Sequence, residues 1–106
     1  MNIEENDLSP VFKLILHKTY YQSGFFNITV DFNRYIGNHQ EIIKLQLGNS
    51  GKVLKGRIDR RANKNGTPRI HGGSDLRNWF QSIYNIGDTI EIYILSPVSL
   101  KIGNKS

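Results

Sequence analysis

The fold prediction for this chain starts from residues 52–69, KVLKGRIDRRANKNGTPR, which place seven Lys and Arg residues around an Asn-Gly pair. From Leu54 onward, small or apolar residues alternate with charged ones, as in a strand with one packed face. The charged face holds Lys55, Arg57, Asp59 and Arg61. Residues 63–66, Asn-Lys-Asn-Gly, tolerate the positive φ of a hairpin tip, and 68–71 resumes an extended conformation. The stretch therefore predicts a basic β-hairpin arm, which is a suitable shape for a nucleic-acid groove.

Apolar segments on both sides of this hairpin are typical of further short strands. We expect them at 11–17, 25–30, 41–47, 89–95 and 98–102. Leu76, Trp79, Phe80 and Ile83 recur at helical spacing after Ser74, which suits an N-cap, so 74–84 is predicted to be a helix with Trp79 and Phe80 in the core. A helical turn is expected at 32–36. About seven strands with two short helices predict a mainly β fold. We expect the sheet to curl into an open or pseudo β-barrel, because curling toward closure leaves less exposed sheet edge.

The charge of the chain is unevenly distributed. The 106 residues carry a formal net charge of +5, but three acidic residues fall within the first nine positions, which contain no Lys or Arg. The remainder holds 14 basic and 6 acidic residues, a net charge of +8. We expect a flexible acidic tail at 1–9, one domain at 10–103 and a short tail at 104–106. The basic excess favours a partner that carries phosphates.

Several classes of protein are disfavoured by what the sequence lacks. Without cysteine there is no disulfide framework and no thiolate metal site, which is compatible with the cytoplasm. No apolar run approaches the roughly 20 residues of a membrane span, and the acidic start is unlike a signal peptide. The three histidines are scattered, so we expect no metal and no cofactor. No catalytic motif is found, so the chain is predicted to bind and not to catalyse.

Two stretches resemble a known family in the order of their elements: IIKLQLGNSGKVLKGRI at 42–58 and GGSDLRNWFQSIYNIGDTIEIYIL at 72–95. The resemblance is to the B3-like DNA-binding pseudobarrel of plant transcription factors and of the effector domains of EcoRII-type restriction endonucleases. That family has a strand, a Gly-containing turn, a strand, a polar hairpin, a helix with an aromatic core and a Gly-Asp turn before an apolar strand. Trp79 and Phe80 are adjacent here, whereas the family typically separates them. The resemblance implies a seven-stranded barrel that grips the major groove of double-stranded DNA with two arms, here 17–25 and 57–69. It also implies that any cleavage belongs to a nuclease domain or subunit outside this stretch.

The residue types in the two arms suit base edges. Arginine pairs with guanine, Asn and Gln pair with adenine, and Asp accepts from cytosine. Base reading is expected from Arg57, Asp59, Arg60, Arg61, Asn63, Lys64, Lys18, Tyr20 and Gln22. Phosphate or supporting contacts are expected from Thr19, Ser23, Lys55, Asn65, Thr67 and Arg69. Asp59 has an alternative role, because it shares a predicted strand face with two arginines and would then orient one of them.

Two other functions stay open at this point. The chain would be a single-stranded DNA or RNA binder if Tyr20, Tyr21 and Phe25 stacked on unpaired bases. It would be a protein-interaction barrel if the basic hairpin docked on an acidic protein surface. The mixture of Arg, Asn and Asp in one arm favours base edges over a plain carboxylate surface.

Overall fold

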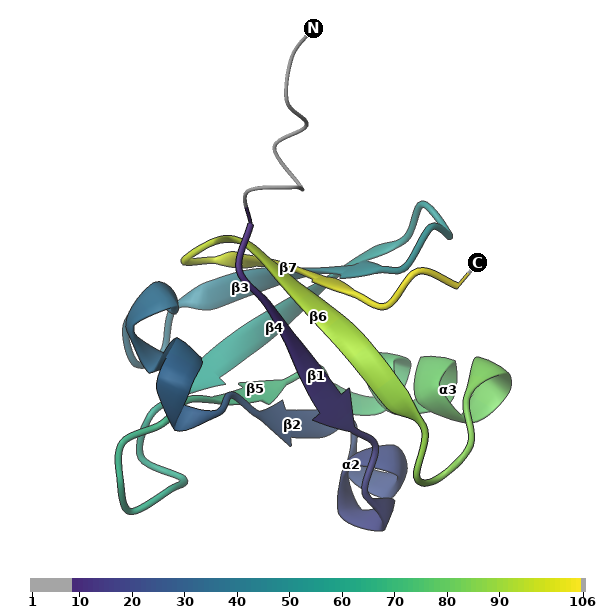
Figure 1. Cartoon of the computed structure of the whole chain (residues 1–106), viewed down its shortest axis with the longest axis horizontal. Coiled ribbons are helices and arrows are strands. Elements are labelled where there is room, and N and C mark those ends of the chain that lie inside the picture. The colour runs from purple at the N-terminus through teal and green to yellow at the C-terminus, as the bar shows by residue number, and fades with distance from the viewer. Residues whose placement is uncertain (1–8, 106) are drawn as a thin grey trace, which may run out of the picture.

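A single sheet of seven strands makes up most of the structure, a computed structural model that describes residues 9–105. The strands are β1 (Val11–Ile15), β2 (Phe25–Asn27), β3 (Ile42–Leu47), β4 (Val53–Asp59), β5 (Arg69–His71), β6 (Thr89–Ser96) and β7 (Ser99–Ile102). Their order across the sheet is β1-β6-β7-β3-β4-β5-β2, and the pair β3 and β7 runs parallel while the others run antiparallel. The sheet curls into a half-barrel (Figure 1), so the predicted mainly β pseudobarrel is confirmed.

Three short helices accompany the described sheet, where the sequence predicts two. They are α2 (Lys18–Ser23), the 3-10 helix η1 (Val30–Tyr35) and α3 (Gly73–Ile83). The predicted N-cap of α3 at Ser74 is wrong, because the cap is Gly72 and no side chain caps it. Instead, the backbone N–H groups of Gly72 and Gly73 both donate to the carbonyl of Gly24, at 2.9 and 3.2 Å. A close backbone contact with the end of α2 therefore accompanies the start of α3.

The helix α2 replaces the polar loop expected between the first two strands. Tyr20 and Tyr21 pack against the core, and this burial favours helical geometry in a segment that reads as irregular in sequence. Gly24 ends the helix in the left-handed conformation, with φ of +73°. A Cβ at Gly24 would lie 2.1 Å from the carbonyl oxygen of Gly73, so the two backbones meet too closely for any side chain.

Several other segments differ from the predicted boundaries. The strand expected at 25–30 ends at Asn27, and the helical turn expected at 32–36 begins earlier, at Val30. Val30 is 64% exposed, so no burial holds it in the sheet. In the predicted hairpin, β4 ends at Asp59 and β5 begins at Arg69, which leaves residues 60–68 as an irregular loop. Arg61 therefore does not share a strand face with Asp59.

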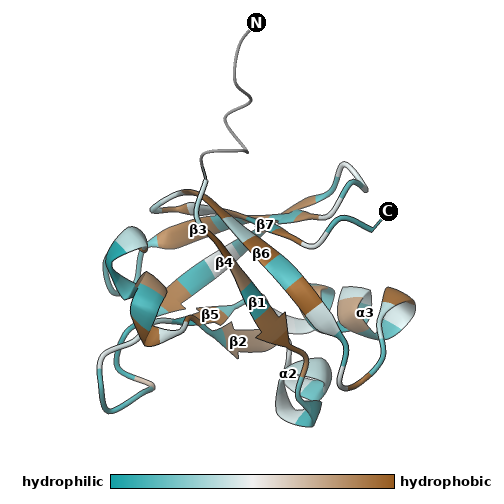
Figure 2. Cartoon of the chain, in the orientation of Figure 1, coloured by the Kyte–Doolittle hydropathy of each residue, from teal (hydrophilic) through white to brown (hydrophobic). Residues whose placement is uncertain are grey.

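The core fills the inside of the half-barrel with aliphatic and aromatic side chains. Leu76, Trp79 and Phe80 of α3 are buried, and so is the inward row of β6, as predicted. That row consists of Ile90, Ile92 and Ile94. Hydrophobic residues concentrate on the strands in Figure 2, whereas α2 and the loop after β4 are mostly hydrophilic. The polar segments are thus set apart from the scaffold that carries them.

Residues 104 and 105, which belong to the short tail expected at 104–106, are hydrogen-bonded to the turn after β3. Asn49 in the turn after β3 donates its backbone N–H to the carbonyl of Lys105 at 2.9 Å and its side-chain amide to that of Asn104 at 2.7 Å. The acidic tail expected at 1–9 lies outside the described residues except for Ser9. Within residues 9–105, no helix is long and apolar enough to cross a bilayer.

Candidate nucleic-acid interface

Two polar segments project from the same side of the half-barrel, the lower side in Figure 1. The first arm is residues 17–25, which contain α2, and the second arm is residues 57–69, most of which form the loop between β4 and β5. The strands β2 and β5 lie between the arms and pair with each other. Together the arms hold six Lys and Arg residues and one acidic residue, Asp59. Both predicted arms are therefore on one side of the scaffold, with a strong basic excess.

The outward side chains of β2, β5 and β4 join the two arms. The strand register places Phe25, His71 and Arg57 in one cross-strand row, and Asn27, Arg69 and Asp59 in the next. The intervening residues Phe26, Ile70 and Ile58 are fully buried, so these six side chains belong to the opposite face of the sheet. We call these six residues the inter-arm strip.

Ring contacts connect α2 to the inter-arm strip. The Tyr20 ring meets the Phe25 ring edge-on at 5.8 Å between centroids, and Phe25 lies 5.8 Å from His71. Tyr20 and Phe25 thus pack on each other, and the guanidinium of Arg69 lies over the Phe25 ring. Tyr21 donates its hydroxyl to the carbonyl of Tyr84 at 3.2 Å, so it also serves packing.

The exposed face of α2 presents the other predicted contacts of the first arm. Lys18, Thr19, Gln22 and Ser23 are all exposed to solvent. The helix is held on α3 by the amide of Gln81, which donates to the carbonyl of Tyr21 at 3.0 Å. The first arm is thus a short helix, bonded to α3, that displays its polar residues.

Asp59 shapes the base of the second arm. Its Oδ1 accepts the backbone N–H of Arg61 at 2.9 Å and that of Ala62 at 3.0 Å, and its Oδ2 lies 3.2 Å from Nε2 of His71. The N–H of Arg61 is the largest influence that holds the pKa of the Asp59 carboxyl below its ordinary value, and His71 adds to it. The alternative in which Asp59 orients an arginine side chain is wrong for the described residues, since it binds backbone groups and a histidine.

Arg60 is engaged inside the protein. Its Nε donates to the carbonyl of Gly37 at 2.8 Å, and its Nη2 donates to that of Ile36 at 2.7 Å. Further hydrogen bonds reach Asn33, through both its carbonyl and its side-chain oxygen, and the carbonyl of Gly66. The sequence assigns Arg60 to base reading, but four intramolecular hydrogen bonds tie it to η1 and to the residues after it, and a fifth reaches Gly66 within the second arm. Arg60 fixes the second arm to the body of the protein.

A polar network also occupies part of the second arm. The Nδ2 of Asn63 donates to Oδ1 of Asn27 at 3.0 Å and to the carbonyl of Thr67 at 3.1 Å. Thr67 is only 5% exposed, and its hydroxyl donates to Oδ1 of Asn65 at 2.7 Å. Thr67 is therefore covered in this conformation, which disfavours the phosphate contact predicted for it from the sequence.

Five cations of the interface have no side-chain partner within residues 9–105. They are Lys18, Lys55, Arg57, Arg61 and Lys64, for which neither a side-chain hydrogen bond nor an ion pair is found. Lys55 also faces Lys44 directly across β3 and β4. Like charges in that position repel each other unless an anion lies between them.

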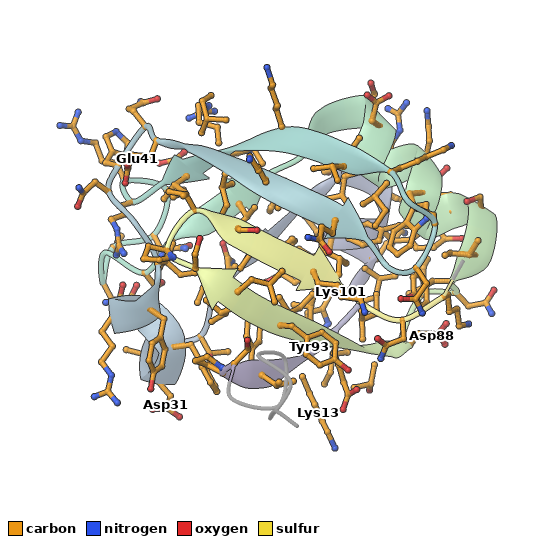
Figure 3. The ribbon with its side chains drawn as sticks, turned by 90° about the horizontal axis from the view of Figure 1, so that it is seen from above. Lys13, Asp31, Glu41, Asp88, Tyr93 and Lys101 are labelled. Atoms are coloured by element: carbon orange, nitrogen blue, oxygen red, sulfur yellow. The ribbon has the colours of Figure 1, made fainter. Side chains whose placement is uncertain are left out.

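The surface on the opposite side of the molecule can be compared with the two arms. Figure 3 views the molecule from that side, where Lys101 of β7 lies beside Tyr93 of β6. The ammonium of Lys101 is 5.6 Å from the centre of the Tyr93 ring, a cation–π contact. Across the described residues, no three side chains of the metal-binding types come together to hold an ion.

Sequence reasoning missed two residues that organise the interface. Asn27 receives hydrogen bonds from both Asn63 and Arg69, and Asn33 receives two from Arg60. Both lie outside the two predicted arms. The alternation Phe25-Phe26-Asn27 does place Asn27 opposite the buried Phe26, but its partners become clear only from the pairing of β2 with β5.

Comparisons with known proteins give a fold and no family. No family model and no curated protein matches the chain. Among solved structures, the chain is similar to the N-terminal domain of Helicobacter pylori LlaJI.R1, with a TM-score of 0.64 and 13% identity over 88% of this chain and 78% of that one. It is also similar to the hypothetical Arabidopsis thaliana protein At1g16640.1, with a TM-score of 0.64 and 13% identity over 92% of this chain and 93% of that one. At this level of identity the similarity establishes a shared fold alone.

Proposed function

We propose that this chain is a sequence-specific double-stranded DNA-binding domain of the B3-like type, whose two arms enter the major groove. The observation that carries the proposal is the placement of both arms on one side, with Lys18 on the first arm and Arg57, Arg61 and Lys64 on the second all lacking a side-chain partner within residues 9–105. Unpaired basic side chains are the electrostatic footprint of a nucleic-acid partner. The fold shared with the N-terminal domain of Helicobacter pylori LlaJI.R1 supports the family resemblance.

The proposed contacts follow from which side chains are free. Arg57, Arg61, Lys64 and Gln22 read bases, because their polar ends have no partner in the described residues. Contacts to phosphates come from Lys18, Thr19, Ser23 and Lys55. Arg60, Asp59 and Asn63 position the second arm and do not contact DNA, because their polar groups are already bonded within the protein.

The facing lysines of β3 and β4 add a separate argument for an anionic partner. Lys44 and Lys55 are both exposed and cross-strand neighbours, and like charges so placed are destabilising. A phosphate near this pair would relieve the repulsion. We also propose that the domain recognises target DNA for a restriction endonuclease, and that a separate nuclease domain or subunit performs cleavage.

Selection of bound sequences from a randomised duplex pool tests the proposal. We expect enrichment of one short site, and tighter binding of that duplex than of either of its single strands. If Lys18, Lys55, Arg57, Arg61 and Lys64 all met phosphates, the slope of log K against log salt would be about −4.5, and each one that reads a base makes it shallower. Absence of any enriched site would contradict sequence-specific recognition.

Competition with single strands separates the proposal from its rival. A single-strand binder needs open aromatic faces, whereas Tyr20 and Phe25 pack on each other. We therefore expect an unlabelled single strand to displace the duplex poorly. Tighter binding of the single strand would favour the rival function, and no binding of any nucleic acid at low salt would favour a protein-interaction barrel.

A further inference from the structure

Arg69 differs from the other cations of the interface because its guanidinium is held in place without being neutralised. Its Cζ lies 4.3 Å from the centre of the Phe25 ring, and its Nε donates to Oδ1 of Asn27 at 3.0 Å. A longer hydrogen bond of 3.4 Å joins Nη2 to Oδ1 of Asn63. All three partners are uncharged. The Phe25 ring therefore packs on one face of the Arg69 guanidinium, and Asn27 binds its Nε edge.

Asp59 would be the natural acidic partner of Arg69, yet no ion pair joins them within the described residues. The two residues are direct cross-strand partners in β4 and β5. The Asp59 carboxylate is instead occupied by two backbone N–H groups of the second arm and by His71. The full charge of Arg69 is thus left at the centre of the inter-arm strip.

The free part of the guanidinium is its terminal edge. Because Nε is bonded to Asn27, the remaining donors are on Nη1 and Nη2, and no hydrogen bond from Nη1 is found within residues 9–105. One N–H from each of these nitrogens forms a parallel fork, which matches O6 and N7 of guanine in the major groove. A fork that is already oriented loses less entropy on binding than a mobile side chain does.

We infer that Arg69 reads a guanine in the target site, and that Asn27 and Phe25 are the residues that position it. This inference rests on the proposed function and changes one assignment made from sequence, in which Arg69 serves only the DNA backbone. Phosphate contacts suit Lys18 and Lys55, which are exposed lysines with no side-chain partner within residues 9–105. An arginine stacked on a ring at the centre of the strip is suited to a planar base edge.

The test compares wild type with Arg69→Gln on the duplex selected by the wild-type chain. We expect Arg69→Gln to weaken binding of that duplex by about 5- to 150-fold and to abolish the preference for guanine at one position. The salt slope should stay unchanged, because a base contact releases no phosphate counterions. Lys55→Gln is the control for a lost cation that contacts a phosphate, since Lys55 has no role in the network around Arg69; it should weaken all duplexes alike and make the salt slope shallower by about 0.9.

Replacing single guanines by 7-deazaguanine, which lacks the N7 acceptor, gives a second measurement on wild-type protein. One replacement should weaken wild type and leave Arg69→Gln unaffected, and Asn27→Ala should lose part of the same preference. If Arg69→Gln fails to fold, the Asn27→Ala comparison decides the assignment. The inference is overturned if the selected site contains no guanine. It is also overturned if Arg69→Gln binds all duplexes equally weakly, with a salt slope shallower by about 0.9. Failure of wild type to bind any duplex would instead contradict the proposed function.

Discussion

Replacing Arg60 by alanine should destabilise the protein, whereas the same replacement of its neighbour Arg61 should not. The two residues are identical in type and adjacent in sequence, but their surroundings differ. Arg60 donates five hydrogen bonds to Gly37, Ile36, Asn33 and Gly66, and all of them are partly buried. Arg61 is exposed, and within the described residues only its backbone N–H is bonded.

The expected loss in the free energy of unfolding of Arg60→Ala follows from the number of hydrogen bonds that Arg60 makes. The bond to Gly66 is long, at 3.3 Å, so we count the other four. At about 0.5 to 1 kcal/mol net for each partly buried bond, the loss is about 2 to 4 kcal/mol. Water can reach part of this site, so the vacated carbonyls do not carry the full penalty of burial. Arg61→Ala should change the free energy of unfolding by less than about 0.5 kcal/mol.

Urea denaturation of the two variants and of wild type measures this difference. We expect a lower midpoint for Arg60→Ala with an unchanged m-value, because the same surface is exposed on unfolding. DNA binding should show the opposite order of effects. Arg61→Ala should weaken the specific complex by about 1 to 3 kcal/mol without loss of stability, because Arg61 is proposed to contact DNA directly and Arg60 is not. Equal midpoints for Arg60→Ala and Arg61→Ala would refute the assignment of Arg60 as the residue that fixes the second arm.

Further predictions concern the scaffold and the base of the second arm. Gly24→Ala should lower the free energy of unfolding by about 2 kcal/mol or more, because the alanine would be strained in the left-handed conformation and would overlap Gly73. Gly66→Ala, at φ +77° with open space around it, should show the strain alone. Equal losses in the two variants would contradict the close contact at Gly24. The folded-state pKa of Asp59 is lowered, so its stabilising effect is present above the unfolded pKa of about 4 and is lost as pH falls through the folded pKa. Unfolding curves from pH 7 to 3 should therefore show a smaller acid loss in Asp59→Ala than in wild type, and identical curves would contradict it.

Strand alternation was enough to predict the scaffold from sequence. The inward residues of β3 and β6 read directly from the period of two, and the spacing of Leu76, Trp79 and Phe80 gave α3. The helix α2 was missed because its six residues are too few to show a helical period, and because the contacts that stabilise it come from α3.

The candidate site was less predictable than the fold, since sequence gives residue types and not their partners. Arg60, Arg61 and Arg69 look equivalent in the sequence, yet one is bonded to carbonyls, one is free and one is stacked on Phe25. What separates them is the pairing of β2 with β5 and the position of η1 beside the second arm. Both are long-range features that a local pattern does not contain.

Duplex binding by two charge-reversed variants of equal net charge tests the central claim most directly. One variant carries Arg61→Glu and Lys64→Glu in the second arm, and the other carries Lys52→Glu in the turn before β4 and Lys101→Glu on the side shown in Figure 3. We predict that the arm variant loses specific binding of the selected duplex, while the control stays within a few-fold of wild type at the same salt concentration. Equal weakening of both variants would mean that overall charge, and not the two arms, holds the DNA, and would contradict the account.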